Sequence, residues 1–343
     1  YTPIHGTGGQ IIPRLFAKAG FENVCCVEEQ MIVDGNFPTV VSPNPEEKAA
    51  LTLAIEKAKK VNADVVLATD PDADRVGIAV RDNNGEFVLL NGNQTAALLT
   101  YYILGRWNEL SKFSGKEYIV KTIVTTELLI DIANKYNVKS FDVLTGFKFI
   151  ADTILNNPEM TFVCGGEESY GFLIGDFVRD KDANSACFMI AEIAAWAAEQ
   201  NKSLYQILKE IYKEFGFYKE GLISLTKKGI SGTEEIKNMM RKFREEPPTE
   251  ILGSRIVEIK DYKIGISKDI ISGKETEIKL PKSDVLQFFT EDGTKISVRP
   301  SGTEPKIKFY FGIKAELNDI ADFDTVNDKL NNRLNELGKL FSE

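Results

Sequence analysis

ADVVLATDPDADR, residues 63–75, is the stretch of sequence that decides the fold. Its first part, Ala63–Ala68, is a short and mostly apolar run, which is typical of a strand buried on both faces of a parallel sheet. Its second part places the carboxylates of Asp70, Asp72 and Asp74 directly after that strand. Because α/β sheets bind ligands beyond the carboxyl ends of their strands, the stretch predicts an acidic loop at a binding edge.

The segments around this stretch alternate between strand and helix patterns. A helix is expected to begin at Asn44–Glu47, where Asn suits the cap and Pro the first turn. Leu51, Ala54, Ile55 and Ala58 then give that helix one apolar face. Strand patterns lie at Tyr1–Ile4, Asn23–Glu28 and Val76–Val80. This βαβαβ order predicts a largely parallel sheet with helices on both faces.

The alternation repeats in the middle of the chain and then gives way to a strand-rich third. In the middle, strands are expected at Tyr118–Val124, Ser140–Leu144 and Thr161–Cys164, and helices at Glu127–Tyr136, Lys148–Asn156, Ala183–Glu199 and Leu204–Phe215. In the last third, strands are expected at Arg255–Ile259, Val285–Phe289, Lys295–Val298 and Lys306–Ile313, and helices at Thr233–Glu245, capped by Thr233, and Phe323–Phe341.

We therefore predict an α/β protein of three domains. Two tandem three-layer α/β domains with mainly parallel mixed sheets are expected at residues 1–105 and 106–218. An α+β domain with a mainly antiparallel sheet is expected at residues 219–343. The acidic loop, residues 70–75, falls in the first of these domains.

The composition is that of a soluble globular protein, with 43% hydrophobic and 27% charged residues. A net charge of −9 argues against nucleic acid or an anionic membrane as the main partner. The longest apolar stretch, residues 183–198, is too short and too interrupted to span a bilayer. The four cysteines show no CxxC spacing, so we expect reduced, buried thiols in a cytoplasmic protein.

The acidic loop predicts a metal site. Unit charges ~4 Å apart repel by about 4 kcal/mol at an effective dielectric of about 20, so three crowded carboxylates need a cation. Hard oxygen ligands suit Mg²⁺ or Ca²⁺. An EF-hand is excluded, because Arg75 and Arg81 stand where that loop requires Gly and Glu. The alternatives are a solvated acidic turn and a metal-dependent phosphatase with Asp70 as its nucleophile.

Two further loops carry polar groups suited to a ligand. The GGEESYG loop, residues 165–171, follows a strand in the middle of the chain, and its acceptors and hydroxyl suit sugar hydroxyls. The RPSGTEPK loop, residues 299–306, combines an Arg, two hydroxyls and a Gly turn, which suits a phosphate. It is not a Walker loop, because the Gly-Lys-Ser/Thr ending is absent. The alternatives are an acidic surface turn and a hairpin loop that satisfies its own backbone.

Together these motifs resemble the α-D-phosphohexomutase family, which includes phosphoglucomutases and phosphomannomutases. HGTGG, TDPDADR, TGFK, GGEESYG and RPSGTEPK occur in the family's order and cover the second, third and fourth of its domains. The resemblance implies that Mg²⁺ binds Asp70, Asp72 and Asp74 and that Arg75 is catalytic. It implies substrate contacts from Thr145, Lys148, Glu167, Ser169 and Lys181, and a phosphate site formed by Arg299, Ser301, Gly302 and Thr303.

The implied activity is interconversion of glucose 1-phosphate and glucose 6-phosphate through glucose 1,6-bisphosphate, with a hexose phosphate as the partner molecule. Phosphomannomutase or phosphopentomutase specificity is an alternative, and a non-catalytic sugar-phosphate-binding module is another. The oligomeric state stays open.

The sequence departs from the family at one point. The family's first domain carries a phosphoryl-bearing serine in a T-A-S-H-N-P setting, and no serine of this sequence stands in such a setting. The sequence also opens at Tyr1, inside a strand-like pattern. We therefore expect a fragment or processed form without the catalytic-serine domain, inactive on its own.

Overall fold

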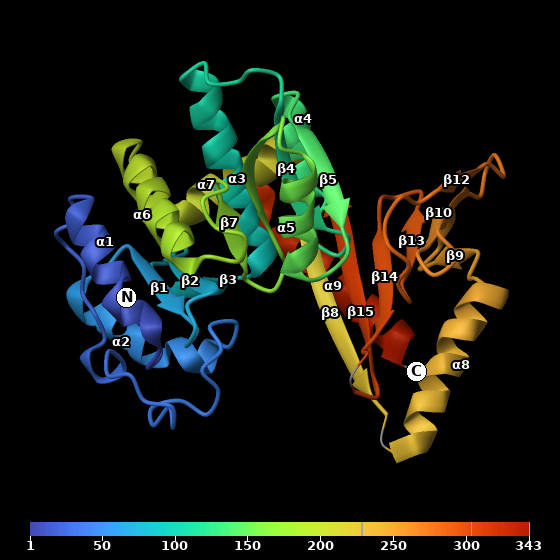
Figure 1. Ribbon diagram of the computed structural model, residues 1–343, viewed down its shortest axis with the longest axis horizontal. Helices are drawn as coiled ribbons and strands as arrows, with labels where there is room; N and C mark the ends of the chain where they lie inside the picture. The colour runs from blue at the N-terminus through green and yellow to red at the C-terminus, as the bar shows by residue number, and fades with distance from the viewer. Residues whose placement is uncertain (228, 303, 343) are drawn as a thin grey trace. The chain divides into compact units, whose positions relative to one another are not determined.

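The computed structural model describes residues 1–227, 229–302 and 304–342, and the chain divides into two compact units, Tyr1–Ile211 and Tyr212–Glu343. Figure 1 shows the helices and strands, many of them labelled. Unit 1 contains one antiparallel sheet and one sheet with parallel strand pairs, and unit 2 contains an antiparallel sheet. The predicted fold class, α/β followed by an antiparallel region, is confirmed.

Three strands in sequence order form the first sheet of unit 1, namely β1 (Val65–Thr69), β2 (Val76–Arg81) and β3 (Phe87–Leu90). Both pairs of neighbours are antiparallel, so the largely parallel pairing expected here is wrong for these strands. A parallel connection needs about a dozen residues or more, and only residues 70–75 join β1 to β2. Thr2 forms an isolated parallel bridge with Ala68 of β1.

The edge of this sheet is less regular than the sequence predicted. The strand expected at Tyr1–Ile4 is reduced to the bridge at Thr2, and the strand expected at Asn23–Glu28 does not form, since residues 23–27 have no regular secondary structure. Cys25 is therefore exposed and Cys26 half-buried, so the expectation of buried thiols is wrong for this pair. The other two cysteines are buried, as expected.

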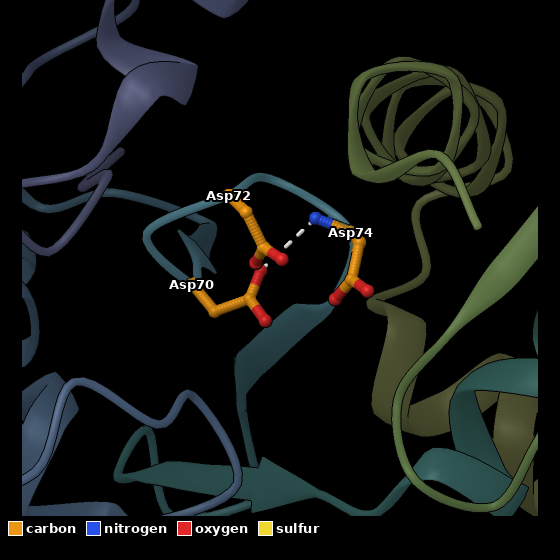
Figure 2. Close-up of side chains that lie close together, drawn as sticks. All are labelled: Asp70, Asp72 and Asp74. Atoms are coloured by element: carbon orange, nitrogen blue, oxygen red, sulfur yellow. Dashed lines mark hydrogen bonds between the residues drawn. The ribbon is translucent and has the colours of Figure 1, made fainter. Parts of the chain in front are cut away.

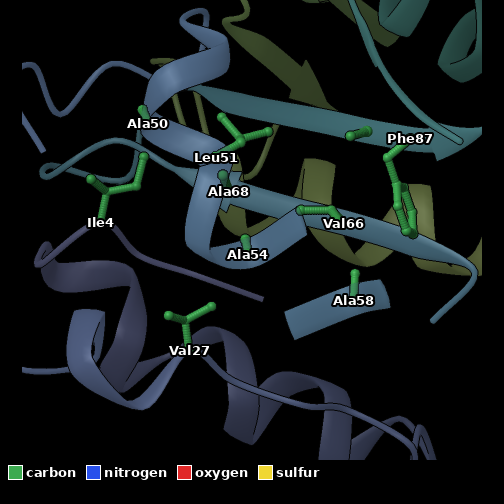
Figure 3. Packing of buried hydrophobic residues seen from close by; sticks show 10 residues of the cluster. Ile4, Val27, Ala50, Leu51, Ala54, Ala58, Val66, Ala68 and Phe87 are labelled. Atoms are coloured by element: carbon green, nitrogen blue, oxygen red, sulfur yellow. The ribbon is translucent and has the colours of Figure 1, made fainter. Parts of the chain in front are cut away.

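Helix α2 (Thr52–Val61) packs on one face of the first sheet (Figure 3). It begins later than predicted, because Asn44–Glu47 forms a turn and the 3-10 helix Lys48–Leu51 precedes it. The apolar face is nevertheless as predicted, with Leu51, Ala54 and Ala58 buried. The core cluster comprises Ile4, Val27, Ala50, Leu51, Ala54, Ala58, Val66, Ala68, Ala79 and Phe87.

The second sheet of unit 1 is mainly parallel, as predicted. Its order is β5 (Lys139–Val143), β4 (Glu117–Thr122), β6 (Thr161–Gly166) and β7 (Phe172–Ile174), and β4 pairs parallel with β5 and β6. Tyr118 and Val120 pack against helix α5 (Phe147–Asn156). Ile119 faces the other way, toward α3 (Gly92–Glu109). Two helices therefore enclose β4 between them, which gives three layers.

The other helical segments of the chain complete the list. They are α1 (Ile12–Lys18), α4 (Leu128–Lys135), α6 (Ala183–Glu199), α7 (Leu204–Phe215), α8 (Gly229–Glu245) and α9 (Phe323–Ser342), with 3-10 helices at Thr7–Gln10, Glu28–Gln30 and Ile320–Asp322. Helix α6, which contacts β1 and β2, has the bounds that were predicted. Thr233 does not cap α8, because that helix already begins at Gly229. Each helix of the described residues is too short or too polar to cross a bilayer.

Unit 2 is built on one antiparallel sheet. Its order is β12 (Glu275–Glu277), β11 (Ile266–Asp269), β10 (Ser254–Asp261), β13 (Leu286–Thr290), β14 (Lys295–Pro300), β15 (Lys306–Ala315) and β8 (Phe217–Thr226), and β9 (Glu250–Ile251) pairs with β10. Helix α9 packs on β15 and β8. The Phe341 ring meets those of Phe309 and Phe311, with centroids 5.2 and 5.6 Å away. The sheet presents the RPSGTEPK loop between β14 and β15.

The core of the first sheet gives a direct test of the fold. Leu51 is fully buried, whereas Leu155 at the end of α5 is 71% exposed. Leu51→Ala should lower the free energy of unfolding by about 2–5 kcal/mol, because it removes buried methyl groups and leaves a cavity. Leu155→Ala should change it by less than about 0.5 kcal/mol. Urea denaturation of both variants measures the difference, and equal losses would contradict the described packing.

Candidate functional site

The acidic loop turns back on itself between β1 and β2, and its three aspartates converge (Figure 2). One carboxylate oxygen from each of Asp70, Asp72 and Asp74 lies within 4.8 Å of the other two. Oδ1 of Asp70 accepts the backbone N–H of Asp74 at 3.0 Å and that of Arg75 at 2.9 Å. Ala73 adopts the left-handed region, with φ 57°, which allows the tight turn. The loop therefore wraps around the buried Asp70 side chain.

Two cations balance part of the negative charge. Nε of Arg75 lies 2.9 Å from Oδ2 of Asp70 and 3.5 Å from Oδ1 of Asp74. Nζ of Lys181 lies 2.7 Å from Oδ2 of Asp74. Oδ1 of Asp74 is buried and accepts no hydrogen bond from any residue that the structure describes. A buried carboxylate oxygen without a hydrogen-bond donor is the kind of atom that a metal ion would satisfy.

The aspartates differ in how readily they ionise. Burial, with the neighbouring Asp74 carboxylate, raises the pKa of Asp70 from 3.8 to about 7. Burial also opposes ionisation of Asp74, but the hydrogen bond and charge of Lys181 outweigh it and lower the pKa of Asp74. Asp70 is therefore only partly ionised near pH 7, and a bound cation would displace the remaining proton. One of the three convergent carboxylates has a raised pKa, and another has a buried oxygen without a hydrogen-bond donor. Such a set suits a hard divalent cation such as Mg²⁺.

The GGEESYG loop lies directly beside the acidic loop within unit 1. Arg75 forms an antiparallel bridge with Gly171, and the backbone N–H of Val76 donates to the carbonyl of Tyr170 at 3.1 Å. Lys181 ties the two loops together, because its side chain crosses Gly171 on the way to Asp74. A Cβ on Gly171 would lie 2.1 Å from Cδ of Lys181, so only glycine leaves room for that path.

Sequence-predicted substrate contacts surround the same junction. Oε1 of Glu167 accepts the backbone N–H of Gly146 at 2.8 Å, which joins the GGEESYG loop to the start of α5. Thr145 precedes that glycine and is half-buried, as is Ser169. Lys148 is exposed in the first turn of α5. Glu167 is the most buried of these residues, with 8% of its surface exposed.

Sequence reasoning missed a second polar cluster next to this loop. Oε2 of Glu168 accepts the hydroxyls of Thr122 and Thr125, each at 3.2 Å, and burial raises the pKa of Glu168. Lys121 is fully buried and lies 3.0 Å from Glu127 and 2.9 Å from Asp142. A lysine within an apolar strand pattern was the available signal. The hydrogen bonds of Glu168 thus attach the GGEESYG loop to the end of β4.

The RPSGTEPK loop connects the antiparallel strands β14 and β15 of unit 2 and forms hydrogen bonds within itself. The N–H of Ser301 donates to the carbonyl of Lys306 at 2.7 Å, and Oγ of Ser301 accepts the N–H of Glu304 at 3.3 Å. Gly302 lies in the loop, and Thr303 lies outside the described residues. Arg299 pairs in register with Lys308 of β15, a cation that sequence reasoning missed. Its signal was the period-two spacing of Lys306 and Lys308 along a strand.

Three family models match successive parts of the chain. Their descriptions are phosphoglucomutase/phosphomannomutase alpha/beta/alpha domain II for residues 1–85, alpha/beta/alpha domain III for residues 91–215, and C-terminal domain for residues 256–323. The chain belongs to the phosphoglucomutase/phosphomannomutase family. The family predicted from the motifs is therefore confirmed.

Two proteins similar in sequence to this chain are named phosphoglucomutase. The chain is 39% identical to the phosphoglucomutase of Staphylococcus aureus strain MRSA252 over 96% of its own length, and 37% identical to that of Staphylococcus epidermidis strain RP62A over 97%. It spans 58% and 60% of the lengths of those relatives.

Solved structures of the family share the fold. The structure of parafusin, a phosphoglucomutase from Paramecium in its open form, matches with a TM-score of 0.64 and 18% identity, over 96% of this chain and 56% of that one. A phosphoglucomutase/phosphomannomutase family protein from Burkholderia thailandensis matches with a TM-score of 0.61 and 18% identity, over 97% of this chain and 59% of that one.

The raised pKa of Asp70 makes cation binding depend on pH. Binding requires the ionised carboxylate, so the affinity for Mg²⁺ should fall about tenfold for each pH unit below 7 and level off above it. Isothermal titration calorimetry with Mg²⁺ at pH 6, 7 and 8 measures this, with Asp70→Asn as the variant that should bind weakly at each pH. An affinity unchanged between pH 6 and 8 would contradict the pKa.

The same group affects the stability of the metal-free chain. Its folded-state pKa of about 7 lies above the ordinary 3.8, so the folded state holds the proton more tightly than the unfolded state. The stability that this group contributes is therefore present at low pH and is lost as the pH rises from about 4 to about 7.

Proposed function

We propose that this chain forms the metal, sugar and phosphate sites of a Mg²⁺-dependent phosphohexomutase that interconverts glucose 1-phosphate and glucose 6-phosphate. The observation that carries the proposal is the convergence of Asp70, Asp72 and Asp74 around one position, with Arg75 and Lys181 beside them. Membership of the family and the phosphoglucomutase relatives support it.

Each group at the acidic loop has a role in the proposed phosphoryl transfer. When bound, Mg²⁺ neutralises charge on the transferring phosphoryl group. The three aspartates would hold it, and the Arg75 guanidinium would donate hydrogen bonds to phosphoryl oxygens. Arg75 and Lys181 already lie at the carboxylates, so positive charge is in place where the phosphoryl oxygens would arrive. Such preorganised charge is the main contribution that a protein makes to this kind of reaction.

The other two loops would bind the rest of the substrate. Glu167 and Ser169 are proposed to bind sugar hydroxyls, with Thr145 and Lys148 next to them. Arg299, Ser301, Gly302 and Thr303 are proposed to hold the phosphate that is not being transferred. Recognition of a phosphate at either end of the sugar lets the substrate bind in two orientations, which a mutase that passes through glucose 1,6-bisphosphate requires.

The phosphoryl group must come from a donor outside the residues described above. In the proposed reaction a phosphoserine gives its phosphoryl group to one oxygen of the hexose phosphate, and the bisphosphate returns the other phosphoryl group to the serine. No serine of this sequence stands in a Ser-His-Asn-Pro setting, so we propose that the donor lies elsewhere in the complete protein. We also propose a cytoplasmic location, in line with four free cysteines.

The proposal predicts binding without turnover by this chain. Titration of glucose 1,6-bisphosphate in the presence of Mg²⁺ should give measurable heat, whereas conversion of glucose 1-phosphate to glucose 6-phosphate should be negligible because no phosphoserine is supplied. A coupled assay for glucose 6-phosphate measures the second quantity.

Three outcomes would contradict parts of this proposal. Rapid turnover by the chain would contradict the need for an external serine. Silence in the titration would contradict both a mutase and a sugar-phosphate-binding module. Release of inorganic phosphate that Asp70→Asn abolishes would favour a phosphatase.

The proposed phosphate site has a matched test within unit 2. Arg299→Met should weaken binding of glucose 1-phosphate by about tenfold to a hundredfold, because a charge-assisted contact to phosphate is lost. Arg255→Met is the control, since Arg255 is exposed and lies 3.7 Å from Glu291. Calorimetry on both variants gives the comparison, and equal affinities would remove Arg299 from the site.

A further inference from the structure

Glu46 contacts the arginine of the acidic loop from outside that loop. Its Oε1 lies 3.3 Å from Nη1 of Arg75, and the two side chains are 33% and 37% exposed. Among the described residues, the carboxylates in contact with Arg75 are those of Asp70, Asp74 and Glu46. Glu46 is therefore the partner of Arg75 that does not belong to the aspartate cluster.

The position of Glu46 is fixed by the turn that carries it. Oδ1 of Asn44 accepts the N–H of Glu46 at 3.1 Å. Pro45 is buried against β2, where a Cβ on Gly77 would lie only 2.3 Å from the Pro45 carbonyl oxygen. The turn at 44–47 thus rests directly on the strand that follows Arg75. A glycine is needed in β2 for this approach, so backbone packing sets the place of the turn that carries Glu46.

Arg75 and a bound cation would compete for the same oxygens. Nε of Arg75 now donates to Asp70 and lies close to Asp74, and both of these carboxylates are proposed metal ligands. A divalent cation bound to these two carboxylates would weaken their electrostatic attraction for the guanidinium. Glu46 lies outside the proposed ligand set and keeps its full attraction for Arg75.

We propose that Glu46 is a positioning residue that holds the Arg75 guanidinium in place for the phosphoryl group while Asp70 and Asp74 bind the cation. This inference rests on the proposed function. Burial, and after it the charge of Glu46, raises the pKa of Tyr170 in the GGEESYG loop to about 12. The Glu46 carboxylate thus contacts the arginine of the acidic loop and acts electrostatically on the tyrosine of the GGEESYG loop.

A double-mutant cycle on the 343-residue chain tests the proposal. Glucose 1,6-bisphosphate is titrated at saturating Mg²⁺ into the wild type, Glu46→Gln, Arg75→Met and the double variant. Glu46→Gln should weaken binding about tenfold, the size of a lost charged hydrogen bond. The double variant should bind no more than about twofold more weakly than Arg75→Met alone, because Glu46 acts through Arg75.

Two further variants separate positioning from a general charge effect. Glu47→Gln removes the same charge one residue away, where the carboxylate accepts the Ser42 hydroxyl at 2.9 Å, and its affinity should stay within about twofold of the wild type. Glu46→Asp keeps the charge on a shorter side chain and should restore part of the affinity.

The outcomes separate this inference from the proposed function. If the wild type binds but Glu46→Gln binds equally well, or if the losses from Glu46→Gln and Arg75→Met simply add, the positioning role is overturned and the proposed function stands. If Glu47→Gln weakens binding as much as Glu46→Gln, the effect is one of general charge and the role is again overturned. If the wild type itself does not bind the bisphosphate, the proposed function fails and this inference fails with it.

Discussion

The crowding of three carboxylates in a six-residue connection is the constraint on which the site in unit 1 depends. The connection is too short for a parallel crossover, so β2 must return antiparallel to β1. That return brings the backbone of Arg75 to Oδ1 of Asp70 and its side chain to Oδ2. Sheet topology and charge balance are therefore linked, because the hairpin that brings the three aspartates together also places the Arg75 guanidinium beside them.

Glycines at two places allow the surrounding segments to reach this hairpin. Gly171 leaves room for the stem of Lys181, which continues to Asp74. Gly6 lies so close to Pro71 that a Cβ would be 2.3 Å from its Cα, and the N–H of Thr7 donates to the Pro71 carbonyl at 2.8 Å. Gly6 and Thr7 of the HGTGG motif thus support the acidic loop.

Strong local patterns allowed much of the fold to be predicted from the sequence. The bounds of α6 and α7 were predictable because each is a long run of helix-favouring residues between clear breaks. Helix α3 was missed because it is buried nearly all round and so lacks one apolar face, although its Asn91–Gln94 capping box was a signal. The pairing direction of β2 was missed because a run of strand residues carries no information on its neighbour, whereas the length of the connection does.

The aspartate motif was predictable, but the different chemistry of its members was not. Three identical side chains in one motif imply equal roles, yet burial raises the pKa of Asp70, and Lys181 lowers that of Asp74. The cause is partly tertiary, since Lys181 comes from a distant part of the chain and meets the loop only in the folded unit. The motif therefore indicates which atoms can bind a cation. The packing around the motif determines the pKa of each carboxyl group and the position of the Arg75 side chain beside them.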